Sequence, residues 1–224
     1  MISAAAEDYL KAIYKLRDGK TVVTTQAVAG RLGVAPPSAT AMVKKLAGLN
    51  LLTHTPYRGV ELTPAGEQAA LEVIRHHRLI ETFLVQVLGV EWDKVHEEAE
   101  RWEHVISEEV EAKMAAALNY PTHDPHGAPI PTEDGRIARD GWVRLADVAS
   151  GTRVHVRRVS DENAEVLRHL RAIGLIPNVE VEVLRAVPAE GVVELLIDGR
   201  RQTVGAGPAK AVFVATQDEM AAEA

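Results

Sequence analysis

The sequence predicts a multi-domain α+β protein: a winged helix-turn-helix, then a helical region, then a small β-barrel. Near the N-terminus, apolar residues recur with helical period around a tight turn, and a short hairpin pattern follows. The central region continues with long stretches of helical period. From Trp142 onward, apolar and polar residues alternate with period two, which is typical of strands. We therefore expect domains at residues 1–64, 65–140 and 141–224.

Composition limits the class of protein. The chain has 224 residues, 46% of them hydrophobic, and no apolar run of transmembrane length, so we expect a soluble protein. The first residues, MISAAAEDYL, lack the basic region and apolar core of a signal peptide, which predicts a cytoplasmic location. Because the chain has no cysteine, disulfides are excluded and any metal site must use nitrogen and oxygen ligands.

Charge is unevenly distributed. The net charge of −7 divides into +4 for residues 1–64, −9 for residues 65–140 and −2 for residues 141–224. A basic first region on an acidic remainder is expected when only that first region meets phosphate. The charge pattern therefore favours DNA binding by the N-terminal domain alone.

Residues 24–49 predict two short helices joined by a tight turn. Thr24 or Thr25 would cap the first helix, Gly33 would end it, and Pro37 lies near the start of the second. This is a helix-turn-helix, whose second helix enters the major groove of DNA with its first residues facing base edges. Because these residues are small, we expect modest direct base readout. They are Ala35, Pro36, Pro37, Ser38, Thr40 and Ala41.

Residues 51–63, LLTHTPYRGVELT, predict a β-hairpin that turns the motif into a winged helix. Arg58 would lie at the tip of this wing. We expect Arg58, together with Lys44 and Lys45 of the second helix, to contact phosphates. The alternative is a packing module that never meets DNA, and the local positive charge argues against it.

The long helical stretch from Pro64 to Gly89 has a wide apolar face near its end. Core burial is the ordinary explanation for such a face, but part of it could form a symmetric interface between subunits. The residues are Ile80, Phe83, Leu84, Val87 and Leu88.

The stretch from Val95 to Val110, VHEEAERWEHVISEEV, is rich in metal-ligand residue types. If it forms one helix, four of these side chains fall within an arc of roughly 100° beside the apolar core face. They are His96, Glu100, Glu103 and His104. Such an edge suits a partly buried metal site, while a solvated, Glu-rich helix face is the alternative. Spacing alone leaves both interpretations open.

Three further residues have weaker signals. His77 and Glu81 are four residues apart, so they share a helical face, but such a pair is more often a solvated surface contact. Asp8 lies near the start of the first predicted helix, over residues 3–17, where a carboxylate is favoured by the helix dipole.

The Pro/Gly-rich segment 119–141 predicts a loop and a linker. It contains His123, Asp124 and His126, which are possible metal ligands. We interpret them as turn residues, because no other ligand-type residues converge on the loop in the sequence.

The C-terminal region predicts five short strands, VRLADV, RVHVRRV, VEVEVL, VVELLI and AVFVAT. A single short helix, about residues 162–173, interrupts them before Gly174. Five strands within such a short region suggest a small barrel.

Several motifs together resemble the diphtheria-toxin-repressor/manganese-regulator family of metal-dependent transcriptional repressors. They are EDYLKAIY, PPSATAMVKKL, PYRGVELTPAG, RHHRLIETFL, VHEEAERWEHVISEEV and DPHGAPIP. The resemblance covers nearly the whole chain. It implies a winged helix, a helical dimerisation domain and an SH3-like domain of the kind found in ferrous-iron transport accessory proteins. It also implies a homodimer that binds palindromic DNA and represses metal-transport genes.

The resemblance implies two metal sites. A primary site would use Asp8, Glu100, Glu103 and His104, and an ancillary site would use His77, Glu81 and His96. The family can also draw an ancillary ligand from the SH3-like domain, for which Asp161, Glu162 and Glu165 are the candidates. Helix capping by Asp161 is an equally good explanation of that residue.

The chain departs from the family pattern in ways that bear on the metal. The iron-responsive branch has Met and Cys where this chain has Asp8 and Glu100, and the harder oxygen ligands favour Mn²⁺, with Fe²⁺ as the alternative. The compact manganese regulators have Glu where this chain has Lys11. We therefore expect two separated metal sites rather than a closely spaced pair.

Two other classes of function compete with a regulator. A metal-dependent hydrolase could use Glu103 and His104 to activate a water, but the sequence offers no obvious nucleophile, oxyanion loop or phosphate-binding glycine loop. A metal-independent winged-helix protein would leave the ligand-rich edge unexplained. We therefore do not expect this protein to be an enzyme.

Overall fold

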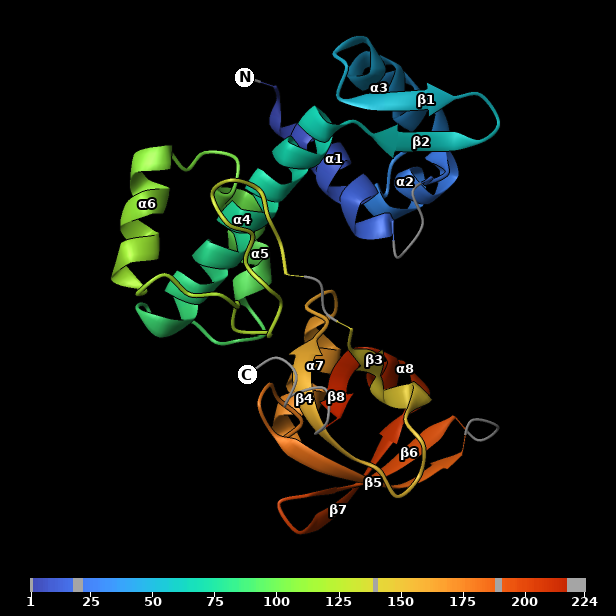
Figure 1. Cartoon of the computed structure of the whole chain (residues 1–224), viewed down its shortest axis with the longest axis vertical. Helices are drawn as coiled ribbons and strands as arrows, with labels where there is room; N and C mark the ends of the chain where they lie inside the picture. The colour runs from blue at the N-terminus through green and yellow to red at the C-terminus, as the bar shows by residue number, and fades with distance from the viewer. Residues whose placement is uncertain (1, 18–21, 139–140, 188–190, 217–224) are drawn as a thin grey trace. The chain divides into compact units, whose positions relative to one another are not determined.

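The computed structural model describes residues 2–17, 22–138, 141–187 and 191–216 (Figure 1). The chain divides into two compact units, each built from several segments. The first comprises Met1–His77, Arg101–Glu111 and Pro131–Ile137. The second comprises Arg78–Glu100, Ala112–Ile130 and Ala138–Ala224. Among the described residues, no helix has both the length and the apolar character needed to cross a membrane.

The first unit contains the predicted winged helix (Figure 1). The Thr24 side chain accepts a hydrogen bond from the Ala27 amide at 3.1 Å, and Gly33 ends the next helix with a left-handed φ of 63°. Both features agree with the sequence prediction. The elements are α1 (Ala4–Leu16), α2 (Thr25–Leu32), α3 (Pro36–Gly48), β1 (Leu52–Thr55) and β2 (Gly59–Leu62).

The wing is an antiparallel hairpin tied to the start of α2. β1 and β2 pair from Leu52↔Leu62 to Thr55↔Gly59, and Val60 also forms a bridge with Val23. A Cβ atom on Gly59 would lie 2.4 Å from the Val23 carbonyl oxygen. Only glycine allows this close approach, so the wing is held against the residues just before α2.

The helical region has three helices: α4 (Pro64–Gln86), α5 (Val95–Trp102) and α6 (Glu108–Ala117). The predicted start of α4 is confirmed, because the Thr63 hydroxyl accepts a hydrogen bond from the Gly66 amide at 3.1 Å. The expectation of one helix from Val95 to Val110 is wrong, since residues 103–105 form a turn and residues 106–107 have no regular secondary structure between α5 and α6.

Local chemistry explains this break. The Val105 and Ile106 amides both bond to the Trp102 carbonyl, and the Ser107 hydroxyl accepts a bond from the Val110 amide at 3.4 Å. Two β-branched residues followed by a capping serine favour a stop and a new start over a continuous helix.

One continuous helix would place Trp102 and Val110 on the same apolar core face as Val95 and Ala99. Val95 and Ala99 are buried, but Trp102 is 37% exposed and Val110 is 45% exposed, so this part of the expected core face is wrong.

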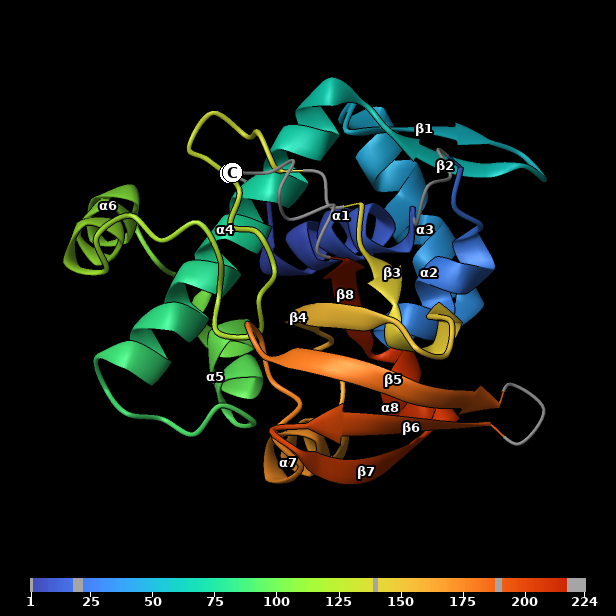
Figure 2. The ribbon, with the colours of Figure 1, turned by 60° about the horizontal axis from the view of Figure 1, so that its bottom comes forward.

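The C-terminal part of the second unit is a small antiparallel sheet of six strands in the order β3-β8-β4-β5-β6-β7 (Figure 2). The strands are β3 (Val143–Arg144), β4 (Arg153–Val159), β5 (Glu180–Val187), β6 (Val192–Ile197), β7 (Arg200–Gly205) and β8 (Val212–Thr216). A 3-10 turn η1 (Leu145–Asp147) and the helices α7 (Ala164–Ala172) and α8 (Ala206–Lys210) complete it. The predicted SH3-like fold is confirmed.

The sequence pattern missed strand β7 and helix α8, and it assigned to a strand the residues Leu145–Asp147, which form η1. The residues of β7, RRQTVG, lack apolar alternation because this strand is a sheet edge with Arg200 and Arg201 exposed. A hairpin signal was nonetheless present. Asp198 and Gly199, both with positive φ, form the two-residue turn between β6 and β7.

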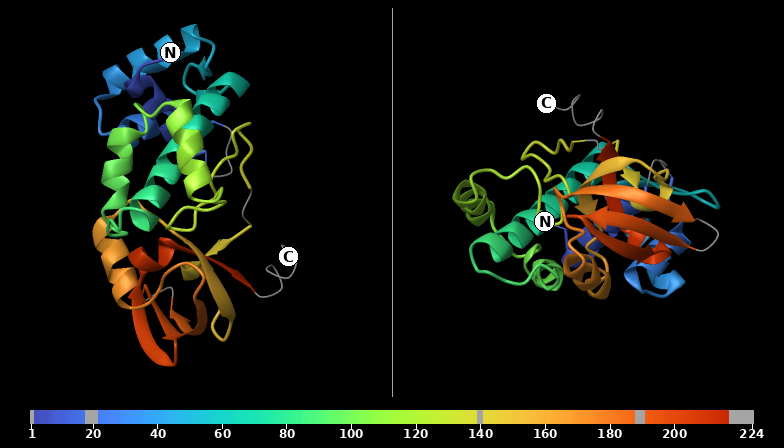
Figure 3. Two further views of the ribbon diagram at one scale, coloured as in Figure 1. Left: turned by 90° about the vertical axis from the view of Figure 1, so that its left-hand side faces the viewer. Right: turned by 90° about the horizontal axis from the view of Figure 1, so that it is seen from below.

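Helix α7 lies beside the sheet (Figures 2 and 3). Its residues Leu167 and Leu170 belong to the same buried core as the strands. Its N-cap is Asn163, whose side chain accepts bonds from the Glu165 and Val166 amides at 2.9 and 3.1 Å. Asp161 therefore does not cap the helix.

Candidate metal centre

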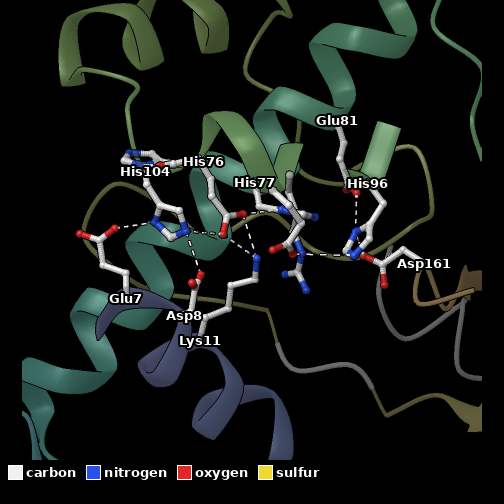
Figure 4. Close-up of polar contacts among 12 residues, drawn as sticks. Glu7, Asp8, Lys11, His76, His77, Glu81, His96, His104 and Asp161 are labelled. Carbon is white, nitrogen blue, oxygen red and sulfur yellow. Dashed lines mark hydrogen bonds and ion pairs between the residues drawn. The ribbon is translucent and has the colours of Figure 1, made fainter. Parts of the chain in front are cut away.

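Three of the predicted primary ligands, Asp8, Glu103 and His104, converge within the first unit. Figure 4 shows the contact between Asp8 and His104. The Nε2 atom of His104 lies 2.8 Å from Asp8 Oδ1 and 3.3 Å from Glu103 Oε1. The ligand-type atoms of these residues all lie within 4.8 Å of one another. Asp8 comes from α1, whereas Glu103 and His104 come from the break after α5. We call these three residues the first cluster.

The first cluster places the half-buried Asp8 carboxylate near the buried Glu103 carboxylate. Glu103 is 1% exposed. Burial raises the pKa of Asp8, although His104 and Lys11 act in the opposite direction. A cation placed beside a half-buried carboxylate with a raised pKa stabilises the charged form of that carboxylate. This arrangement therefore suits a divalent metal ion.

Glu103 also has cationic and polar partners within the same unit. Lys11 Nζ lies 2.7 and 2.8 Å from its two carboxylate oxygens, and His77 Nδ1 bonds to Oε2 (Figure 4). A buried carboxylate requires such partners. The predicted ancillary ligand His77 is therefore a neighbour of Glu103, a contact that the helical spacing did not reveal.

A second group of ligand-type residues surrounds Glu81 in the second unit. Glu81 lies on α4 and is fully buried. His96 Nδ1 lies 3.3 Å from Glu81 Oε1 and 3.3 Å from Asp161 Oδ2 (Figure 4). Burial lowers the pKa of His96, but the bonds to Asp161 and Glu81 outweigh it and raise the pKa to about 10.

Asp124 and His126, which we had interpreted as turn residues, also face Glu81. Asp124 does hold a turn, since its Oδ1 accepts bonds from the His126 and Ala128 amides at 2.8 and 2.9 Å. However, Glu81, Asp124 and His126 offer ligand atoms within 4.8 Å of one another, and all three are buried. We call Glu81, His96, Asp124, His126 and Asp161 the second cluster.

The pKa values within the second cluster depart from their usual ranges. Burial raises the pKa of Asp124 to about 6, and the nearby Glu81 charge adds to this effect. Burial lowers the pKa of His126, but Glu81 outweighs it and raises the pKa to about 9. The His126 ring is held by stacking on Trp92, at 5.1 Å between centroids, and its Nε2 lies 3.0 Å from the Trp92 carbonyl oxygen.

Glu100 differs from the other predicted primary ligands. It belongs to the second unit, its side chain is 41% exposed, and its Oε1 lies 3.7 Å from His96 Nε2. Glu7 also contacts the centre although no sequence pattern indicated it: its Oε2 lies 2.6 Å from His104 Nδ1. Glu7 adjoins Asp8 in the sequence, and that adjacency was the available signal.

The predicted DNA-contacting side chains lie on the surface of the first unit. Thr40 is partly buried, and its hydroxyl donates to the Pro36 carbonyl at 2.9 Å. The others are exposed: Ala35, Pro36, Pro37, Ser38, Lys44 and Lys45 around α3, and Arg58 on the wing.

Three family models match the chain. Residues 1–60 match "Iron dependent repressor, N-terminal DNA binding domain", residues 63–132 match "Iron dependent repressor, metal binding and dimerisation domain", and residues 143–216 match "FeoA domain". The iron-dependent repressor IdeR of Mycobacterium leprae is 35% identical over 202 residues, covering 85% of this chain and 87% of its own. The chain belongs to the iron-dependent repressor family.

This family, which includes the diphtheria toxin repressor, consists of metal-dependent transcriptional repressors rather than enzymes, so the hydrolase alternative is excluded. Solved structures agree with the fold. A manganese-dependent transcriptional repressor in complex with manganese has a TM-score of 0.88 at 37% identity, over 94% of this chain and 99% of its own. ScaR with bound Zn²⁺ has a TM-score of 0.81 at 32% identity, over 94% and 99%. The predicted family and winged-helix architecture are confirmed.

Proposed function

We propose that this repressor is activated by Mn²⁺, acts as a homodimer on a palindromic operator, and represses genes for metal-ion transport. Fe²⁺ is the alternative activator. The observation that carries the proposal is the first cluster, in which the winged-helix residue Asp8 meets Glu103 and His104. A regulator that must sense metal and bind DNA needs such a link between its ligands and its DNA-binding elements.

The donor set supports manganese. We propose Asp8, Glu100, Glu103 and His104 as the primary ligands, which gives three carboxylates and one imidazole. Hard oxygen donors suit Mn²⁺, whereas iron, zinc and copper gain more from nitrogen and sulfur. The similar proteins named above are variously described by iron, manganese and zinc, which supports a divalent transition metal without choosing among them.

We propose a separate ancillary site around Glu81. His77, Glu81 and His96 are the ligands that the family resemblance implies, and Asp161 is the proposed contribution of the FeoA-like domain. The short contacts of His96 with Glu81 and Asp161 support this choice. Asp124 and His126 provide further donors on the other side of the Glu81 carboxylate.

The mechanism follows from the place of Asp8 on α1. Leu10 and Ile13 of the same helix belong to the core that holds α2 and α3 together, so a change in α1 is passed to the DNA-contacting helix. A bound divalent ion would supply positive charge that Asp8 and Glu103 share. These residues then hold α1 against the break after α5, which favours one arrangement of the winged helix over others.

The remaining elements have conventional roles in this proposal. The small residues at the start of α3 face base edges, while Lys44, Lys45 and Arg58 contact phosphates. The exposed Val87 and Leu88, 52% and 55% accessible, suit a symmetric subunit interface. We propose functional domains at residues 1–64, 65–140 and 141–224, and a cytoplasmic location, where the DNA target is.

The test is a DNA-binding titration on promoter fragments of manganese- and iron-transport genes. It is run without metal, with Mn²⁺, and with Fe²⁺ under anaerobic conditions. We expect tight, saturable binding only with metal, and tighter binding with Mn²⁺ at equal metal occupancy. Equal binding in all three conditions would overturn metal activation. Preference for Fe²⁺ would establish the alternative activator.

A further inference from the structure

The His104 ring lies between two consecutive carboxylates of α1. Its Nε2 faces the first cluster, at 2.8 Å from Asp8 Oδ1, while its Nδ1 lies 2.6 Å from Glu7 Oε2 (Figure 4). Consecutive residues of a helix point about 100° apart, so Glu7 and Asp8 can reach the two different nitrogens of one ring. The first cluster includes Asp8 but not Glu7, and Glu7 contacts the ring nitrogen that does not face Asp8 and Glu103.

The chemistry of imidazole gives these two contacts different roles. A histidine binds a metal through a nitrogen lone pair, and its other ring nitrogen then carries the proton. Nε2 is the nitrogen that shares the cluster with Asp8 and Glu103, so with a metal ion bound at Nε2 the Nδ1 atom would carry the proton and donate it to Glu7. A carboxylate that accepts this bond fixes the tautomer and orientation of the ring and makes its free nitrogen a better donor.

Resting on the proposed function, we propose that Glu7 is a positioning residue of the metal centre. It orients His104 and sets its tautomer without touching the ion. The partial burial of the pair supports this role, since the His104 side chain is 12% exposed and that of Glu7 is 24% exposed. A hydrogen bond screened from water in this way holds a ring more firmly than a surface contact does.

The competing explanation is that Glu7 only stabilises α1. It lies in the first turn of this helix, where a carboxylate favours the helix dipole. That role predicts a loss of helix stability with no specific effect on metal affinity. A test must therefore read metal binding separately from folding.

The experiment compares Glu7→Gln with Glu67→Gln. Both replacements remove one carboxylate at α1: Glu7 is a residue of its first turn, and Glu67 Oε2 lies 3.0 Å from Nη1 of Arg17, its C-terminal cap. Free Mn²⁺ is counted by electron paramagnetic resonance during a titration, and thermal unfolding of the metal-free proteins is recorded in parallel. We expect Glu7→Gln to weaken the first-cluster site by about 10- to 100-fold with unchanged stoichiometry. Glu67→Gln should bind as the unmodified protein does.

A second measurement needs no variant. The unmodified protein is loaded with Zn²⁺, which is diamagnetic, and the His104 ring nitrogens are observed by long-range proton–nitrogen correlation. We expect a protonated Nδ1 and a metal-bound Nε2. Metal bound at Nδ1 would overturn the proposal, as would equal Mn²⁺ affinities for Glu7→Gln and Glu67→Gln. If the unmodified protein binds no metal, the proposed function fails together with this inference, which distinguishes that failure from a failure of Glu7 alone.

Discussion

The first and second clusters each contain a buried carboxylate, and different cations stabilise its charge. In the first, the buried Glu103 carboxylate is paired with the Lys11 ammonium. In the second, the buried Glu81 carboxylate is paired with two histidines, His96 and His126. A lysine cannot serve as a metal ligand while it is charged, but a histidine becomes one by losing a proton. The comparison teaches that the buried Glu103 carboxylate is neutralised in part by a fixed charge, whereas the cations beside the buried Glu81 carboxylate can lose a proton to a competing metal ion.

The largest effect should come from removing the carboxylate that joins the first cluster to the winged helix. We expect Asp8→Ala to weaken metal-dependent DNA binding by at least about 100-fold, more than the loss of an outer partner produces. Metal-free dimerisation should not change. Gel-shift titration and sedimentation measure the two properties. Asp134→Ala, which alters an exposed carboxylate of the same unit, is the control. Normal repression by Asp8→Ala would mean that the first cluster does not couple metal to DNA.

The proton competition at the second cluster predicts a pH dependence. The pKa values of His96 and His126, raised to about 10 and about 9, keep both rings protonated in the metal-free protein at neutral pH. Metal binding needs neutral rings, so between about pH 6.5 and 9 it should tighten by up to tenfold per pH unit for each proton released. Calorimetry in buffers of different ionisation enthalpy counts these protons. The Asp8→Ala protein isolates the second cluster.

The same shifts affect folding in the absence of metal. Because the folded pKa values exceed the unfolded value of 6.5, the two histidine contacts stabilise the fold fully below that pH. This contribution should disappear as the pH rises through about 9 and 10.

If metal binding at the second cluster releases no protons, its histidines are not ligands and the contrast between the two clusters is lost.

The fixed charge at the first cluster is tested by Lys11→Met. Breaking the buried pair should destabilise the metal-free protein by about 3 kcal/mol, because the buried Glu103 carboxylate loses its main partner. The released carboxylate should bind Mn²⁺ about tenfold more tightly, since no neighbouring positive charge opposes the ion. Thermal unfolding and Mn²⁺ titration give the two quantities. Weaker metal binding would show that Lys11 orients Glu103 for the ion rather than competing with it.

The smallest effect concerns metal choice. Glu100→Cys replaces a hard oxygen donor with a soft sulfur donor, which should shift the relative affinity towards Fe²⁺ or Zn²⁺ over Mn²⁺ by roughly tenfold. Competition titrations between pairs of metals measure the ratio. Glu97→Cys is the matched control, as an exposed glutamate nearly one turn earlier on α5. Unchanged ratios in Glu100→Cys would remove Glu100 from the proposed primary ligands.

The sequence by itself determined the winged helix and the residue types of the metal centre. The capping Thr24, the left-handed Gly33 and the Pro-led start of α3 act over a few neighbouring residues, so their outcome can be predicted from the local pattern. The alternating strands of the C-terminal region are similarly local. The family motifs added which residues to consider as ligands, including Asp8, for which spacing alone gave only a helix-dipole role.

Only the tertiary structure decided how these residues meet. His104 lies 97 positions from Glu7 and Lys11 lies 92 positions from Glu103, and no local period relates residues so far apart. The break at residues 103–107 mattered most, because a continuous helix would have aligned Glu103 and His104 with the α5 face. Asp124 and His126 were set aside for the same reason: their partner Glu81 is distant in sequence, and only packing brings the loop to it.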